Sequence, residues 1–213
     1  MPSPLINVER PGRLIDELDL AAVVAVSPEN THYLSSVFIR TQVTIRDRIA
    51  VVLWPREAEP SFLVCNIEES LARKEGSIDD IRTYVEFAES PIRSLAGLIQ
   101  ERGLAGERLG VEMRYISAQQ MEQLVELLPG RQLVSIDEAM DQVRAVKTPA
   151  EIERIVAAYR LTEEGIRRAW SAPSEGVSER LVANRMGQAF FELGSEGLRH
   201  MTPSSGENTR PPP

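Results

Sequence analysis

The sequence predicts an α/β protein: an α/β sandwich built on a mixed, largely parallel sheet, followed by a helical region. Short β-rich runs alternate with helical stretches over the first two-thirds of the chain, which is typical of a sheet covered by helices. The pattern then changes to two long amphipathic helices. With 213 residues, 42% of them hydrophobic, the chain can bury a sizeable core in one large or two small domains. We expect a first domain over residues 1–137, a linker over 138–148 and a second domain over 149–213.

Six short runs of apolar and β-branched residues carry the expected strands. They are residues 20–26, 49–54, 62–65, 81–85, 109–112 and 133–136. Their lengths and their polar boundaries fit buried strands. The polar, proline-bounded segment 55–60 separates the second run from the third, and it predicts an antiparallel hairpin with a long loop.

Helices are expected between these runs, and two of them begin after a serine. Ser27 can cap a short helix that starts at Pro28. Ser117 stands three residues before Gln120, which is the capping-box spacing. The core-facing stripe of this second helix is expected to be Ala118, Met121, Val125 and Leu128. Further helical stretches are expected at residues 13–18, 67–74 and 91–103.

The second region opens on a strong helix start, because residues 148–151 read T-P-A-E, a capping box with proline at the first helical position. Its apolar stripe at helical spacing is Ile152, Val156, Tyr159, Ile166 and Trp170. A second helix begins near Ser178. Two such helices need an apolar surface to cover, and only residues 197–213, with one possible strand, remain to supply it. We therefore expect the second domain to be incomplete.

Composition argues against several functions. The 24 Lys and Arg residues are outnumbered by 32 Asp and Glu residues, so the net charge is −8, and an acidic chain without a basic stripe is a poor nucleic-acid binder. The longest apolar run, residues 20–26, falls far short of the roughly 20 residues that span a bilayer. We expect no membrane partner and, with Cys65 as the one cysteine and no leader pattern at the start, a cytoplasmic location.

The sequence also contains few residues and motifs that could bind a metal ion or act as a nucleophile. The only histidines are His32 and His200, so a His-rich zinc site of the usual spacing cannot form. The sequence also lacks the common zinc, phosphate-binding and serine-nucleophile motifs. On the residues alone, no catalytic, cofactor-binding or metal-binding residue can be assigned.

Four segments together resemble the creatinase/prolidase family. Residues 27–34 read S-P-E-N-T-H-Y-L, residues 144–152 read R-A-V-K-T-P-A-E-I, residues 176–179 read G-V-S-E and residues 205–208 read S-G-E-N. These "pita-bread" hydrolases depend on metal ions and include Xaa-Pro dipeptidases and aminopeptidase P. The resemblance is specific because the four segments follow one another in the family's order over nearly the whole chain. One departure lies just after residue 34, where the family usually has glycine and this chain has Ser35 and Ser36.

The resemblance implies a creatinase-type N-terminal domain followed by the first part of a truncated α+β pita-bread catalytic domain. A complete relative hydrolyses the bond before proline with two divalent cations (Mn, Co or Zn), whose ligands would begin directly after Pro213. The implied partners are a second subunit in a homodimer, and a proline-containing peptide or a small amidino or sulfonium compound as substrate. This chain would then hold no metal ligand and would be inactive alone.

A few residues are implied as contacts at the mouth of the site. Ser205, Gly206 and Asn208 would shape the mouth loop, and His200 would lie on the strand that leads to it. Arg40 lies near a substrate-contacting loop of relatives, where it could bind a carboxylate through two parallel hydrogen bonds. For His200 and Arg40 a structural or solvated role competes with the functional one.

Three functions remain open at this point. The first is part of a metal-dependent Xaa-Pro peptidase, or of a creatinase-like or sulfonium-cleaving relative. The second is a metal-free binding or dimerisation module of the same family, and the third is an unrelated α/β ligand-binding protein. The apolar stripes of the two C-terminal helices favour the first, because a module that stands alone would replace them with charge.

Overall fold

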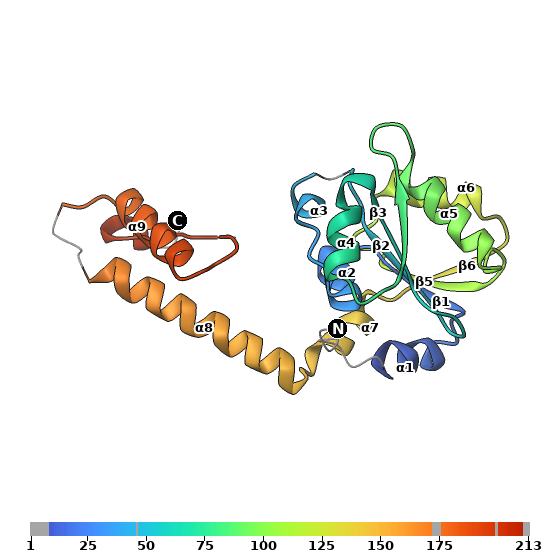
Figure 1. Cartoon of the computed structure of the whole chain (residues 1–213), viewed down its shortest axis with the longest axis horizontal. Helices are drawn as coiled ribbons and strands as arrows, with labels where there is room; N and C mark the ends of the chain where they lie inside the picture. Colours follow the sequence, from blue (N-terminus) through green and yellow to red (C-terminus); the bar gives the residue numbers. More distant parts are fainter. Residues whose placement is uncertain (1–8, 46, 172–175, 199, 211–213) are drawn as a thin grey trace. The chain divides into compact units, whose positions relative to one another are not determined.

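The computed structural model describes residues 9–45, 47–171, 176–198 and 200–210 (Figure 1). The chain divides into two compact units, Met1–Thr148 and Pro149–Pro213. Each unit has its own packing and is described by itself.

Unit 1 is built on one six-stranded sheet. Its strands are β1 (Ala22–Ala25), β2 (Val51–Pro55), β3 (Ser61–Cys65), β4 (Asp80–Tyr84), β5 (Arg108–Val111) and β6 (Gln132–Ser135). They lie in the order β4-β3-β2-β1-β5-β6. β2 is antiparallel to both of its neighbours, whereas the pairs β3–β4, β1–β5 and β5–β6 are parallel. The predicted mixed, largely parallel sheet is confirmed.

Helices cover both faces of this sheet (Figure 1). They are α1 (Glu9–Glu17), α2 (Pro28–Ser35), α3 (Arg40–Thr44), the 3₁₀ helix η1 (Asn66–Glu68), α4 (Glu69–Glu75), α5 (Pro91–Glu101), α6 (Ala118–Leu127) and α7 (Asp137–Ala145). One core contains side chains of α1, α2, α4 and α7, and the other contains side chains of α5 and α6. Unit 1 is therefore a three-layer α/β sandwich.

The central strand β1 shows why the sequence folds this way. Val23 and Ala25 belong to one core, and Ala22 and Val24 belong to the other. All four are buried, as expected for a strand covered on both faces, so the strand reads as a continuous apolar run. Packing next to it is tight: a Cβ atom on Gly110 of β5 would lie 2.5 Å from Cγ2 of Ile136.

The helix caps at Ser27 and Ser117 form as predicted, but the buried stripe of α6 differs from the predicted one. Ser27 Oγ accepts a hydrogen bond from the Asn30 amide, and both halves of the Ser117 capping box are present. The expected stripe of α6 is wrong in part, because Val125 is 45% exposed and Leu124 is fully buried. The helix meets the sheet with Leu124 and Leu128, so its buried face is turned by one residue from the predicted one.

Residues 138–148 are expected to form a linker, but the structure folds most of them into α7. Met140 is fully buried in the core that α1 and α2 share. The carboxylate of Asp137 accepts hydrogen bonds from the amides of Met113 and Arg114, which ties the start of α7 to the end of β5. This segment therefore belongs to unit 1.

Unit 2 is a helical hairpin of α8 (Pro149–Trp170) and α9 (Glu179–Glu192), followed by the 3₁₀ helix η2 (Gly206–Thr209). The two long helices are those the sequence predicts. They meet where Gly165 lies against the ring of Phe190, so closely that a Cβ atom on Gly165 would be 2.2 Å from a ring carbon. No strand forms among the described residues from 197 onward.

The predicted apolar stripe of α8 is not buried within unit 2. Its exposed fractions range from 40% at Val156 to 69% at Tyr159, and Ile152, Ile166 and Trp170 fall between these values. The reason is that α9 packs against another side of α8, the side that carries Gly165 and Ala169. Unit 2 thus pairs its helices through small residues and leaves the larger apolar side chains in solvent.

Candidate functional site

Residues 205–209, which the family resemblance implies as the mouth loop, are held by a carboxylate from α9. Oε1 of Glu179 accepts hydrogen bonds from the backbone amide of Ser205 at 2.5 Å and from its hydroxyl at 3.0 Å. Nδ2 of Asn208 donates to Oε2 at 3.0 Å and to Oε1 at 3.2 Å. We call this arrangement the Glu179 clamp. It joins the segments G-V-S-E and S-G-E-N, which the sequence analysis treats separately.

The clamp stabilises the ionised form of Glu179. Hydrogen bonding from Asn208, and then from the backbone and hydroxyl of Ser205, lowers the pKa of this carboxyl below its ordinary value. Sequence reasoning did not single out Glu179 as a partner of residues 205–208. Glu179 belongs to the G-V-S-E segment, but nothing in the spacing of the sequence indicates that its carboxylate contacts Ser205, 26 positions later.

The predicted mouth residues are therefore partly brought together. Ser205 and Asn208 share one carboxylate, and Gly206 sits between them with φ of 53°, in the left-handed region that favours glycine. A Cβ atom on Gly206 would meet nothing within 4 Å, so this side of the loop is open. The side chains of Ser205 and Asn208, in contrast, are engaged within the chain.

The other two predicted contacts are placed differently. His200 is exposed, and the strand expected to carry it is absent because the described residues around it adopt no regular structure. Arg40 is the first residue of α3 in unit 1 and is exposed. Their assignment as substrate contacts stays a prediction.

A second carboxylate, buried in unit 1, holds the S-P-E-N segment. Glu112 is 3% exposed, and its Oε2 accepts hydrogen bonds from the amides of Val26 at 2.5 Å and Ser27 at 2.8 Å. Its Oε1 accepts from Nδ2 of Asn30 at 2.5 Å. We call this arrangement the Glu112 clamp. It fixes the turn from β1 into α2.

A polar side chain completes the surroundings of this turn. Nε2 of Gln42 donates to the carbonyl oxygens of Val26 at 2.7 Å and Ala50 at 3.2 Å, and its Oε1 accepts from Thr31 Oγ1 at 3.2 Å. Buried polar groups are stable only when they are paired in this way. The S-P-E-N segment therefore reads as a structural joint between β1, α2 and α3.

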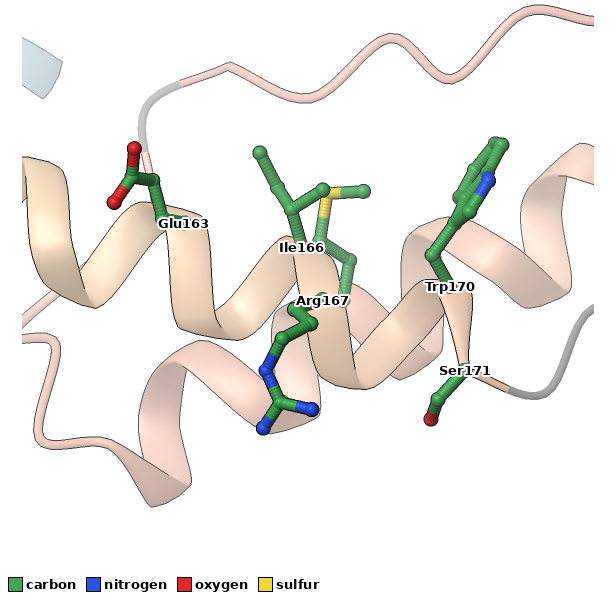
Figure 2. A pocket seen from close by; sticks show the side chains of 6 residues that line it. Glu163, Ile166, Arg167, Trp170 and Ser171 are labelled. Atoms are coloured by element: carbon green, nitrogen blue, oxygen red, sulfur yellow. The ribbon is translucent and has the colours of Figure 1, made fainter.

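Unit 2 also carries an open, mostly apolar hollow. Figure 2 shows Ile166 and Trp170 pointing to one side of α8, while Arg167 and Ser171 point to the other. Met186 of α9 and Glu163 complete the lining. The guanidinium of Arg167 is paired with Glu164 at 2.7 Å, so it is already engaged. The hydroxyl of Ser171 donates to the Arg168 carbonyl oxygen at 2.8 Å, and among the described residues that line the hollow no side chain that could act as a base is hydrogen-bonded to it.

The residues in hand do not fit a metal centre. In the part of the chain that the structure describes, no three His, Cys, Asp or Glu side chains lie together in a way that could hold an ion. Among the same residues, no helix is both long and apolar enough to cross a bilayer.

Comparison with known proteins identifies the family. The profile of the Creatinase/Prolidase N-terminal domain matches residues 8–146. The match covers well over half of the sequence, and the chain belongs to this family. The family resemblance is thus confirmed, and so is the fold of unit 1, although two of the four segments, residues 176–179 and 205–208, lie outside the matched range.

The similar proteins are peptidases by name. The putative dipeptidase YkvY of Bacillus subtilis (strain 168) is 27% identical over 196 residues, which is 92% of this chain and 52% of that protein. The prolidase from Pyrococcus furiosus superposes with a TM-score of 0.72 at 21% identity, over 89% of this chain and 54% of that one. The X-Pro aminopeptidase from Thermotoga maritima gives 0.73 at 17% identity, over 87% and 50%. The chain spans about half the length of these relatives.

A match to a shorter structure shows how much of this chain an isolated N-terminal domain accounts for. The N-terminal domain of an X-Pro dipeptidase from Streptococcus pyogenes is covered over 98% of its length by only 64% of this chain, with a TM-score of 0.53 at 14% identity. The longer relatives match 87–89% of this chain, more than unit 1 alone contains. Their fold therefore continues into the α8–α9 hairpin.

Proposed function

We propose that this chain provides the N-terminal domain and the opening helical hairpin of an Xaa-Pro peptidase, an enzyme that hydrolyses the peptide bond before proline. The observation that carries the proposal is the match to proteins named dipeptidase, prolidase and X-Pro aminopeptidase across both units. We place the boundary between the two parts between Thr148 and Pro149.

Hydrolysis of such a bond needs a strongly nucleophilic water and a polarised carbonyl group, which two divalent cations (Mn, Co or Zn) supply in a complete enzyme of this kind. The described residues offer no ligand set for these ions, so no step of the reaction is assigned to this chain. Its proposed part is structural, and the mouth loop is proposed to shape the entrance of the substrate pocket. The 213-residue chain alone is then inactive.

The remaining features of the proposal follow from the family and the composition. A proline-containing peptide is the proposed substrate, and a small amidino or sulfonium compound is the alternative for a creatinase-like relative. The proposed assembly is a homodimer, as the family resemblance implies. The proposed location is the cytoplasm, which the single Cys65 supports because it leaves no pair for a disulfide.

The test compares the 213-residue chain with a fusion in which it precedes the half of the Bacillus subtilis protein that the match leaves uncovered. After loading with Mn²⁺ or Co²⁺, both are assayed against Xaa-Pro dipeptides, creatine and a sulfonium compound, and their metal content is measured. We expect Xaa-Pro hydrolysis by the fusion and none by the short chain or by the bacterial half alone.

Two results would contradict the proposal. Turnover or stoichiometric metal in the short chain would mean that its own carboxylates and histidines form a site. A folded, metal-loaded fusion that cleaves none of the substrates would support a non-catalytic binding or dimerisation module instead.

A further inference from the structure

The same hydrogen-bonding arrangement occurs twice in the chain. Residues 27–30 read S-P-E-N and residues 205–208 read S-G-E-N, and in both a distant glutamate accepts hydrogen bonds from the serine amide and from Nδ2 of the asparagine. Glu112 reaches its serine over 85 positions, and Glu179 does so over 26. Because Ser27 begins a joint that is purely structural, the second instance indicates that Ser205 and Asn208 also serve the shape of their own segment.

We infer that Glu179 is a positioning residue for the mouth loop: it occupies the polar groups of Ser205 and Asn208, so that a substrate meets the open backbone side at Gly206 instead. The part of this inference that concerns a substrate rests on the proposed function. The part that concerns the loop stands on the contacts alone.

The local geometry shows that the carboxylate has no competing task. The N-cap of α9 is Ser178, whose hydroxyl already accepts from the Leu181 amide at 3.3 Å. Glu179 is the first residue of the helix, where a negative charge is favoured by the helix dipole. Both of its oxygens are engaged by the loop, which leaves it acting as a tie between α9 and residues 205–208.

The loop is closed on itself as well as tied to α9. The Asn208 amide donates to the Ser205 carbonyl oxygen at 3.1 Å, and Oγ1 of Thr209 donates to the Gly206 carbonyl oxygen at 2.7 Å. At Gly206, in contrast, a Cβ atom would have nothing within 4 Å, so the space beside this backbone position is open. A ligand can approach the backbone there without displacing any of these hydrogen bonds.

Spectroscopy on the ¹⁵N-labelled 213-residue chain tests the clamp directly. The Ser205 amide and the Asn208 side-chain amide should both follow one titration, at a pH below that of an ordinary glutamate. The other charged groups on the two segments are Arg180, Glu207 and Arg210, so Glu207→Gln serves as the matched control that should leave this titration in place. In Glu179→Gln the titration should vanish, and the amides of residues 205–209 should exchange with solvent faster.

A second variant keeps the test valid if Glu179→Gln disturbs α9. Asn208→Ala leaves the helix untouched, and the carboxyl signal of Glu179 should then titrate at a higher pH than in the parent chain. The inference is overturned if the Ser205 signal ignores Glu179→Gln, if its titration follows Glu207, or if Asn208→Ala leaves the Glu179 titration where it was.

The fusion described above tests the functional part. Glu179→Gln and Asn208→Ala should raise KM to a similar extent with little change in kcat, and the double variant should be no worse than either single one, because both act through the loop. Additive losses would show that Asn208 contacts the substrate itself. A fusion without activity would remove the proposed function and leave the spectroscopic result intact.

Discussion

The Glu112 clamp and the Glu179 clamp are two versions of one arrangement, and they differ mainly in burial. Glu112 is 3% exposed, and its partners Ser27 and Asn30 are buried at 8% and 3%. Ser205 and Asn208 are exposed. Water can replace a lost acceptor at the surface, but it cannot do so inside the sheet sandwich, where an unpaired donor keeps its full desolvation cost. The same pattern of residues is thus a rigid joint in unit 1 and an adjustable tie in unit 2.

The largest effect is expected at the buried clamp. Glu112→Gln replaces one acceptor oxygen by a donor among three donors, and it should reduce the free energy of unfolding of unit 1 by about 2–4 kcal/mol. Urea unfolding followed by Trp54 fluorescence in a Trp170→Phe background measures this, with the exposed Glu122→Gln as the control. A loss no greater than that of the control would show that the clamp is dispensable and the comparison mistaken.

The next largest effects are expected on replacing one helical glycine in each unit by alanine, because the two replacements should change the stability of the two units in opposite directions. Gly165→Ala places a Cβ atom 2.2 Å from the Phe190 ring and should destabilise the α8–α9 hairpin by roughly 1–3 kcal/mol. A Cβ atom on Gly97 in α5 would have nothing within 4 Å, and Gly97→Ala should stabilise unit 1 by about 0.5–1 kcal/mol. Trp170 and Trp54 report the two units separately. Equal responses of both reporters to Gly165→Ala would contradict independent packing.

A smaller gain is expected after α2. Ser36 ends this helix with φ of 65°, in the left-handed region that favours glycine. A side chain in the left-handed region costs energy that glycine avoids, so Ser36→Gly should raise the stability of unit 1 by about 0.5–1 kcal/mol. Thermal unfolding checks this against Ser94→Gly in α5, which should lower it. A loss of stability in Ser36→Gly would mean that the contact of its hydroxyl with Ser77 outweighs the strain.

The smallest effects are expected on the stability of unit 1 at low pH. Burial alone would raise the pKa of Asp80, but hydrogen bonds from Ser61, Arg82 and Arg102 outweigh it and hold the pKa below its ordinary value. Because the folded-state pKa is depressed, the ionised carboxylate stabilises unit 1 above the unfolded-state pKa, and this is lost as the pH falls through the folded-state value. Asp80→Asn should therefore flatten the fall in melting temperature on acidification.

The control for this experiment lies in unit 2. Arg167, and then Arg168, lowers the pKa of Glu164 to about 2, but this pair is at the surface and is screened by solvent. Glu164→Gln should leave the acid profile of unit 1 unchanged. An Asp80→Asn profile identical to that of the parent chain would show that Asp80 does not control acid stability.

Much of the fold could be predicted because it depends on local sequence patterns, such as apolar runs and helix caps. The apolar runs mark all six strands, and serine caps mark α2 and α6. What failed was the direction in which α6 faces, because it buries Leu124 and not Val125, and the structure of residues 138–145, which form α7 and pack Ala139, Met140 and Val143 at the core. Such choices depend on the surface that a helix meets, and spacing along the chain does not contain that surface.

The candidate site was predicted less well, for a related reason. Motif order implied that Ser205 and Asn208 shape a mouth loop, but it gave no sign that both side chains donate hydrogen bonds to Glu179. Hydrogen bonds between distant polar side chains carry no periodicity, so only coordinates reveal which donors are already engaged. The two Ser-X-Glu-Asn segments were the available signal, since each needs an acceptor from elsewhere.

The place of β1 in the sheet has a consequence for the order of folding. Ala22 pairs with Pro55 on one side and with Leu109 on the other. During synthesis β1 can join β2, β3 and β4 while its second edge still awaits a partner made much later. Pairings between distant segments are slow to form, and an open strand edge in the interim can bind other chains. Glu112 follows β5 directly, so the arrival of that strand both closes the edge and delivers the carboxylate that locks the turn after β1.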